Sequence, residues 1–88
     1  MNGPLVNSFV CALAHLGAPA PIVADEHPTK QAVWLKWNVS HLNSQDMVNL
    51  VTDAFNMVNH DFNKRLNSIE FIRVCDGDES VAVIFEVH

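Results

Sequence analysis

The sequence predicts an α+β fold in which two helices pack on a three- or four-stranded, mainly antiparallel sheet. Three patterns predict it: apolar residues recur at helical spacing in 4–16 and 43–66, residues 32–39 alternate with period two, and residues 68–88 form two β-rich runs around the turn DGDE. The expected order is helix, short strand, strand, helix, strand, strand. Connected antiparallel strands with helices packed on a face form an α+β fold of two layers.

The length and composition indicate one folded domain, residues 1–88. A chain of 88 residues supports a single core, and 49% hydrophobic against 17% charged residues provides enough apolar surface to offset the ordering entropy. The net charge is −5, and the 5 Lys and Arg residues form no run. Nucleic-acid phosphates and anionic membranes both attract clustered positive charge, so neither is an expected partner.

The compartment expected from the sequence is the cytoplasm. No apolar run approaches the roughly 18 residues that a membrane span needs. The apolar segment 5–20 ends in an A-x-A pattern, as signal peptides do, but no Lys or Arg precedes it and polar residues interrupt it. Two cysteines, Cys11 and Cys75, fit free thiols in a reducing compartment better than a disulfide framework.

The first helix is expected over residues 4–16. Pro4 suits a first helical turn, because its missing N–H has no partner there, and Gly17 followed by Pro19 ends the helix. On a helical wheel one broad apolar face collects Leu5, Val6, Phe9, Val10, Ala12, Leu13 and Leu16.

The next segment is rich in proline and predicts a connection with one short strand near 22–24 and a turn over 25–29, which together suit an edge hairpin. Residues 32–39 then form the clearest strand. Their alternation places Val33, Leu35, Trp37 and Val39 on one side and Ala32, Trp34, Lys36 and Asn38 on the other.

A second helix is expected from Asn43 to about Leu66. Asn43 followed three residues later by Asp46 resembles a capping box with a shorter acid. Its expected buried face holds Met47, Leu50, Val51, Ala54, Phe55, Met57, Val58 and Phe62. In the last strand of the closing hairpin, one face collects Val81, Val83, Phe85 and Val87.

Several constellations resemble chemical sites and are better explained structurally. Cys11 and His15 share ligand spacing, but two ligands do not make a metal site, and neither cysteine has a visible activating group. The turn DGDE lacks the ligand spacing of a calcium loop. Asp53, His60 and Asp61 lie near one another on the second helix with no second element aimed at them. We therefore expect no enzyme, no metal and no cofactor.

The polar side of the second helix consists mostly of asparagine, and Asn49, Asp53, Asn56 and His60 lie on it. Asparagine is a mediocre helix former, because its amide competes with the backbone for hydrogen bonds. One interpretation is a contact surface rich in hydrogen-bonding groups. The other is a compositional bias, since asparagine is frequent elsewhere in the chain as well, and this second interpretation is favoured.

The side of the sheet that carries Trp34 is unusually apolar. We expect it to present Trp34, Ile72, Val74, Ala82 and Ile84 among Lys36, Glu70 and Glu86. Such a surface is too apolar for an open face, so either the first helix crosses to cover it or another chain does. An exposed Trp among aliphatic residues is typical of interface anchors. The expected protein-binding residues are Trp34, Lys36, Ile72 and Ile84 on the sheet, and Asn49, Asp53, Asn56 and His60 on the helix.

These patterns favour a small acidic, non-enzymatic protein-binding module, an inhibitor or adaptor that acts by surface contact, with homodimerisation as one form of that contact. Two alternatives stay open. One is an acidic inhibitor that occupies the nucleic-acid groove of a larger enzyme, by analogy with viral anti-defence proteins of similar size and charge. The other is a small metal protein or Cys/His enzyme built around Cys11, His15 and a further histidine.

Overall fold

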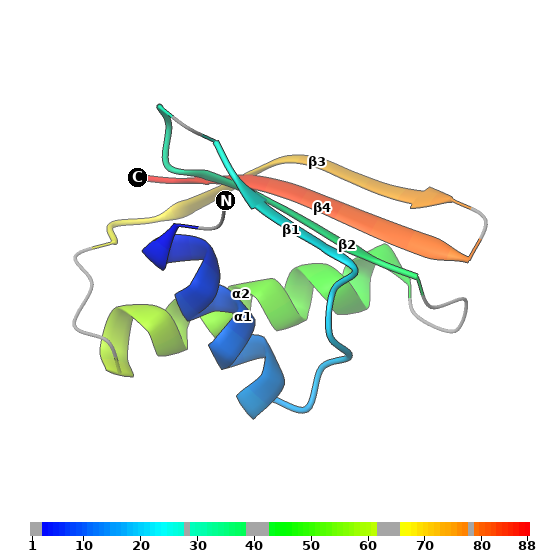
Figure 1. Ribbon diagram of the computed structural model, residues 1–88, viewed down its shortest axis with the longest axis horizontal. Helices are drawn as coiled ribbons and strands as arrows, with labels where there is room; N and C mark the ends of the chain where they lie inside the picture. The colour runs from blue at the N-terminus through cyan, green and yellow to red at the C-terminus, as the bar shows by residue number, and fades with distance from the viewer. Residues whose placement is uncertain (1–2, 28, 39–42, 62–65, 78) are drawn as a thin grey trace.

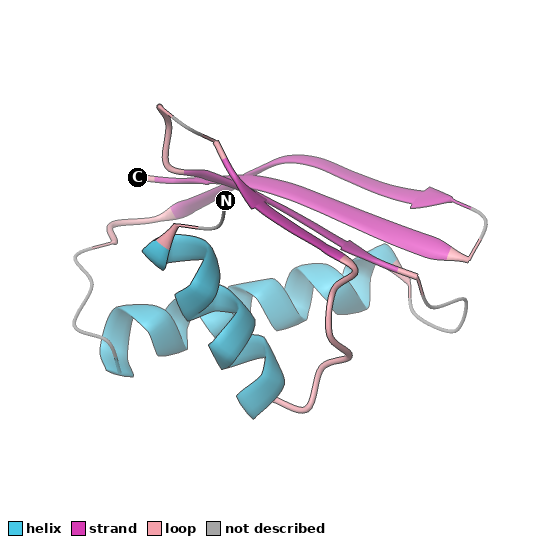
Figure 2. Cartoon of the chain, in the orientation of Figure 1, coloured by secondary structure: helices cyan, strands magenta, loops and turns pink. Residues whose placement is uncertain are grey.

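The computed structural model places two helices against one face of a four-stranded antiparallel sheet, as the sequence predicts (Figure 1, Figure 2). The structure describes residues 3–27, 29–38, 43–61, 66–77 and 79–88. The spatial order of the strands is β1-β2-β4-β3. In chain order the elements are α1 (Pro4–His15), β1 (Val23–Glu26), β2 (Ala32–Trp37), α2 (Ser44–Asp61), β3 (Ile69–Gly77) and β4 (Ser80–Val87). Neither helix, among the described residues, combines the length and apolar character needed to cross a membrane.

Helix α1 ends one residue before its predicted boundary, in a glycine cap. Gly17 has φ 81°, a left-handed conformation that costs glycine little because it has no Cβ. Its N–H donates to the carbonyl of Ala14 (3.1 Å), and the N–H of Ala18 donates to that of Leu13 (3.0 Å). This pair of bonds is a Schellman motif, and it satisfies two carbonyls that the helix end would otherwise leave free.

Helix α2 begins where the capping pattern predicts and ends earlier than expected. The side-chain oxygen of Asn43 accepts a hydrogen bond from the backbone N–H of Asp46 (2.9 Å), which caps the first turn. The predicted end at Leu66 is wrong, because the Leu66 N–H donates to the Asn59 side chain (3.2 Å), seven residues back. The expected core position Phe62 lies outside the described residues.

The core lies between the helices and the inner side of the sheet. Trp37 is fully buried, and its indole N–H donates to the carbonyl of Pro19 (2.6 Å), which ties the proline-rich connection to the sheet. Phe9 of α1 meets Phe85 of β4 with ring centroids 5.0 Å apart. The strand positions that belong to the core follow the predicted alternation: Val33, Leu35, Trp37, Val81, Val83, Phe85 and Val87. Ala32, on the other side of β2, is also buried but is not part of this core.

The predicted edge hairpin is present, although β1 extends further than expected. Asp25 and Glu26, assigned to a turn by the sequence, belong to the strand, because they pair with Trp34 and Val33 of β2. The Glu26 carboxylate lies against Gly3, where any β-carbon would collide with it. Helix α1 has no acidic residue in its own first turn, so Glu26 supplies the negative charge that complements its positive end.

A β-bulge corrects the predicted faces of β3. The register of β3 on β4 shifts by one residue between Phe71 and Arg73. Strict alternation would put Val74 on the same side as Ile72, but the structure packs both Phe71 and Val74 against the core. Since these residues are three apart, they face the same side only if one extra residue is inserted between them. Val74 therefore does not belong to the exposed side, and Arg73 and Cys75 replace it there.

Candidate functional site

We call the side of the sheet turned away from both helices the outer face. Because both helices lie on the other side (Figure 1), the alternative in which α1 covers this face is wrong. Cross-strand pairing arranges its side chains in three rows across the strands in the order β1, β2, β4, β3. The middle row is Asp25, Trp34, Ile84 and Arg73, with Val23, Lys36, Ala82 and Cys75 on one side of it and Ala32, Glu86 and Glu70 on the other.

The centre of the outer face is apolar and open. The side chains of Trp34 and Ile72 are 43% and 55% exposed, two of the four large hydrophobic residues exposed in the described part of the chain. Ile84 lies beside Trp34 on the neighbouring strand and is partly exposed. Ile72 is the extra residue of the bulge and shares the place opposite Ile84 with Arg73.

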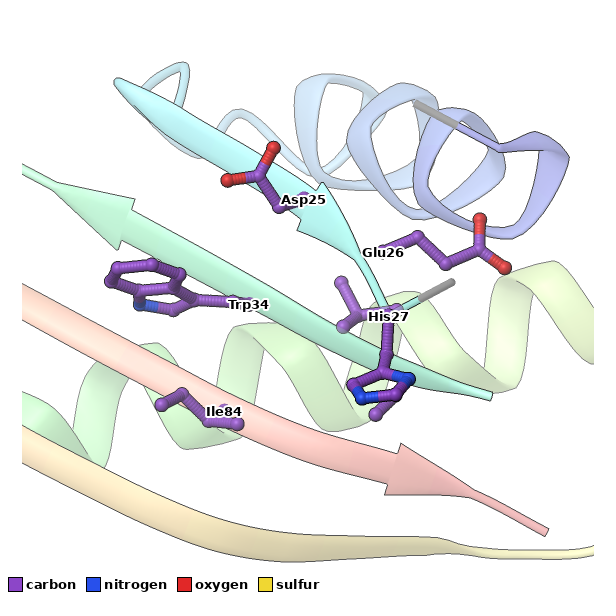
Figure 3. A pocket seen from close by; sticks show the side chains of 7 residues that line it. Asp25, Glu26, His27, Trp34 and Ile84 are labelled. Carbon is purple, nitrogen blue, oxygen red and sulfur yellow. The ribbon is translucent and has the colours of Figure 1, made fainter. Parts of the chain in front are cut away.

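A hollow adjoins Trp34 on this face (Figure 3). Its volume is about 230 Å³, and it is lined by residues 25–27, residues 32–34 and Ile84. In Figure 3 the ring of His27 and the indole of Trp34 flank it, while the side chain of Glu26 turns away toward α1. The ring of His27 is held in place, because its Nδ1 accepts hydrogen bonds from the backbone N–H groups of Thr29 and Lys30, both 3.2 Å.

Charges of both signs surround the apolar centre. Asp25 occupies the β1 edge of the middle row and Arg73 the β3 edge, and both are exposed. Lys36 follows Trp34 along β2, one row away. The Arg73 Nε donates to the sulfur of Cys75 (3.1 Å), which holds the guanidinium over the outer face.

The bulge creates one cluster that the sequence did not reveal. Glu70 pairs with Glu86, and the His88 Nε2 lies 3.4 Å from the Glu70 carboxylate and 3.7 Å from that of Glu86. If the pairing next to the turn continued along the hairpin without a bulge, Glu86 would lie opposite Phe71. The sequence could have indicated the bulge through Phe71 and Val74, because two apolar residues three positions apart in a strand face the same side only if one residue is inserted between them.

Two carboxylates and one imidazole form a donor set suited to a divalent cation. This is the single group of three metal-ligating side chains within 4.8 Å of one another among the residues that the structure describes. Glu70 and His88 are 71% and 52% exposed, so water competes for the same positions. A simpler role is structural: the His88 ring lies beside two carboxylates that are placed directly opposite each other on neighbouring strands. Cys11, exposed on α1, and Cys75 are both free.

The asparagine-rich side of α2 is exposed, but the structure does not bring it together with the outer face. Asn49, Asp53, Asn56 and His60 are all exposed on the helix, which packs on the opposite side of the sheet (Figure 1). Part of the asparagine content has a structural explanation. Asn43 caps the helix and Asn59 binds the returning chain, while the Asn49 amide oxygen accepts from Gln45 (3.0 Å).

No family model matches this sequence, and no curated protein or solved structure matches it either.

Proposed function

We propose that this protein is a small, non-enzymatic binding module that acts as an adaptor or inhibitor by docking its outer face on a protein surface. One observation carries the proposal: in a fold of two layers, the outer face keeps Trp34 and Ile72 open at its centre. An antiparallel sheet with one face toward water usually alternates apolar and polar side chains cleanly. This sheet is apolar on both sides at its centre.

Covering Trp34 with a partner surface would contribute a large free energy of binding for a single residue. Trp34 is 43% exposed. With a full side-chain surface of about 250 Å², about 100 Å² of it still contacts water. At about 25 cal/mol per Å², burying that area yields about 2.5 kcal/mol. A contribution of this size is typical of the residues that dominate protein interfaces.

The charge pattern supports a protein partner over a nucleic-acid mimic. A groove blocker concentrates negative charge on the surface that enters the groove. Here the outer face carries two basic side chains, Lys36 and Arg73, as well as the acidic side chains of Asp25, Glu70 and Glu86. Mixed charges around an apolar centre match the polar rim and apolar core of protein interfaces. The free thiols of the described chain support a reducing compartment, the cytoplasm, as the place of action.

Site-specific photocrosslinking tests the proposal. A photoreactive amino acid replaces Ile72 on the outer face, and a matched probe replaces Asn56 on α2; both positions are exposed. In the cell that makes the protein, the probe at Ile72 should give a discrete protein adduct, and the probe at Asn56 should not. If both positions yield the same adducts, or neither yields any, the outer face is not the binding surface.

A further inference from the structure

We infer that the outer face binds the outer face of a second copy of this chain, with a two-fold axis running parallel to the strands between β2 and β4. This inference rests on the proposed function and names the partner. The reason is that the face is complementary to itself under that rotation. In an isologous contact residue i meets residue j and residue j meets residue i, so a suitable face carries matched groups at symmetry-related places.

The middle row shows the match most directly. Rotation about this axis exchanges β1 with β3 and β2 with β4, since the order across the sheet is β1-β2-β4-β3. Asp25 of one copy then meets Arg73 of the other, and Trp34 meets Ile84. Opposite charges face each other at both edges, and apolar side chains meet at the centre. An axis perpendicular to the strands would instead set Asp25 on Asp25 and Arg73 on Arg73.

The shape of the outer face is also complementary to itself under this two-fold rotation. The hollow lies between β1 and β2, from the middle row toward Ala32. Its symmetry-related position lies between β3 and β4, where the bulge raises Ile72, 55% exposed, next to Ile84. A closed cavity of about 150 Å³ accommodates benzene, so the hollow of about 230 Å³ admits an isoleucine side chain. Each copy thus offers one projection and one recess at exchangeable places.

The size of the sheet sets the strength of the contact. Four strands at about 4.8 Å spacing and about seven residues at about 3.3 Å rise give a face of about 19 Å by 23 Å. The area of such a face, about 440 Å², is below the roughly 800 Å² per partner that a standard interface buries. The dimer should therefore form and dissociate with concentration, which allows association to be measured directly.

Charge reversal at the two edges provides the test. Asp25→Arg and Arg73→Asp each place like charges opposite each other in the dimer, so each variant alone should self-associate at least about tenfold more weakly than the wild type. An equimolar mixture of the two variants should recover a heterodimer, because each copy then meets the opposite charge. Within one copy the two residues lie on opposite edge strands, about 14 Å apart, so no contact inside the monomer explains such a recovery.

Sedimentation velocity from about 1 μM to about 500 μM measures the association. Asp53→Arg, on the exposed side of α2, is the matched control: it makes the same charge change and should leave association unchanged. Circular dichroism checks that each variant keeps the fold. The inference is overturned if the wild type stays at the mass of one chain throughout, or if the mixed variants fail to associate.

Failure of this inference and failure of the proposed function give different results. If the wild type is monomeric while the photoreactive probe at Ile72 captures a different protein, the second copy is the wrong partner and the outer face remains the binding surface. If the wild type is monomeric and the probe captures nothing, both proposals are wrong.

Discussion

The two tryptophans of β2 should respond very differently to removal, although they are three residues apart. Trp37 is fully buried, and its indole N–H is bonded to the carbonyl of Pro19. Trp37→Ala leaves a cavity that costs about 3–5 kcal/mol and deprives that carbonyl of its partner, at about 1–3 kcal/mol more. Trp34→Ala removes a side chain that is 43% exposed, so about 140 Å² of its roughly 250 Å² is covered in the monomer. At about 25 cal/mol per Å², with allowance for the compactness of the unfolded chain, the monomer should lose about 2–3 kcal/mol.

These costs are to be compared with the whole stability of the domain. For 88 residues a typical free energy of unfolding is about 4–13 kcal/mol. Trp37→Ala should therefore unfold the chain or leave it barely folded, whereas Trp34→Ala should cost about half as much and keep a cooperative transition. Urea unfolding followed by circular dichroism, at a concentration low enough to keep the protein monomeric, gives both values.

The reasoning is refuted if the two variants lose the same free energy of unfolding. That result would mean that the Trp34 side chain packs within the monomer as tightly as that of Trp37, and that the outer face is not free to bind a partner. Trp34→Phe serves as the matched variant, since it preserves an aromatic group on the sheet surface and should differ from the wild type by less than about 1 kcal/mol.

Three further outcomes are expected. Glu79→Gly should raise the free energy of unfolding by about 0.5 kcal/mol in urea melts, because Glu79 has φ 59° and a non-glycine residue is strained there; a loss of stability would contradict this. Glu26→Gln should lower stability by about 0.5 kcal/mol at low salt and by less at high salt, since its charge acts on the α1 dipole; an effect independent of salt would point to packing instead. Cys11→Ser should leave folding and self-association unchanged in melts and sedimentation, since Cys11 lies on α1, away from the outer face, and we assign its thiol no chemical role; loss of association in a folded variant would assign one.

The bulge at Ile72 links the core to the proposed surface. It allows Phe71 and Val74 to face the helices together, and Phe71 packs near Phe85 with ring centroids 6.1 Å apart. The same insertion raises Ile72 from the outer face and turns Arg73 to the edge opposite Asp25. A requirement of the core thus produces the projection and the charge on which the proposed self-association depends.

Much of the fold was predictable because its signals are local. Alternation in β2 and β4 identified the buried side of each strand, and Trp34 was correctly separated from Trp37. Asn43 and Gly17 marked where α2 begins and where α1 ends, since capping involves only residues within one turn. The end of α2 was missed because the backbone N–H of Leu66 donates to the side chain of Asn59, seven residues back, and not to a helical carbonyl. No residue propensity along the sequence predicts this hydrogen bond.

The sequence by itself determined the order of helices and strands and the apolar side of both helices, of β2 and of β4, because periodicity and capping depend on neighbours a few residues apart. Only the tertiary structure decided that both helices cover the same side of the sheet, and that one residue is inserted in β3 at Ile72. Both are outcomes of packing between distant segments: the register of β3 on β4 is the one that packs Phe71 and Val74 against the core at once. From that register, and not from any local pattern, come the pairing of Glu70 with Glu86 and the placement of Arg73 across the sheet from Asp25.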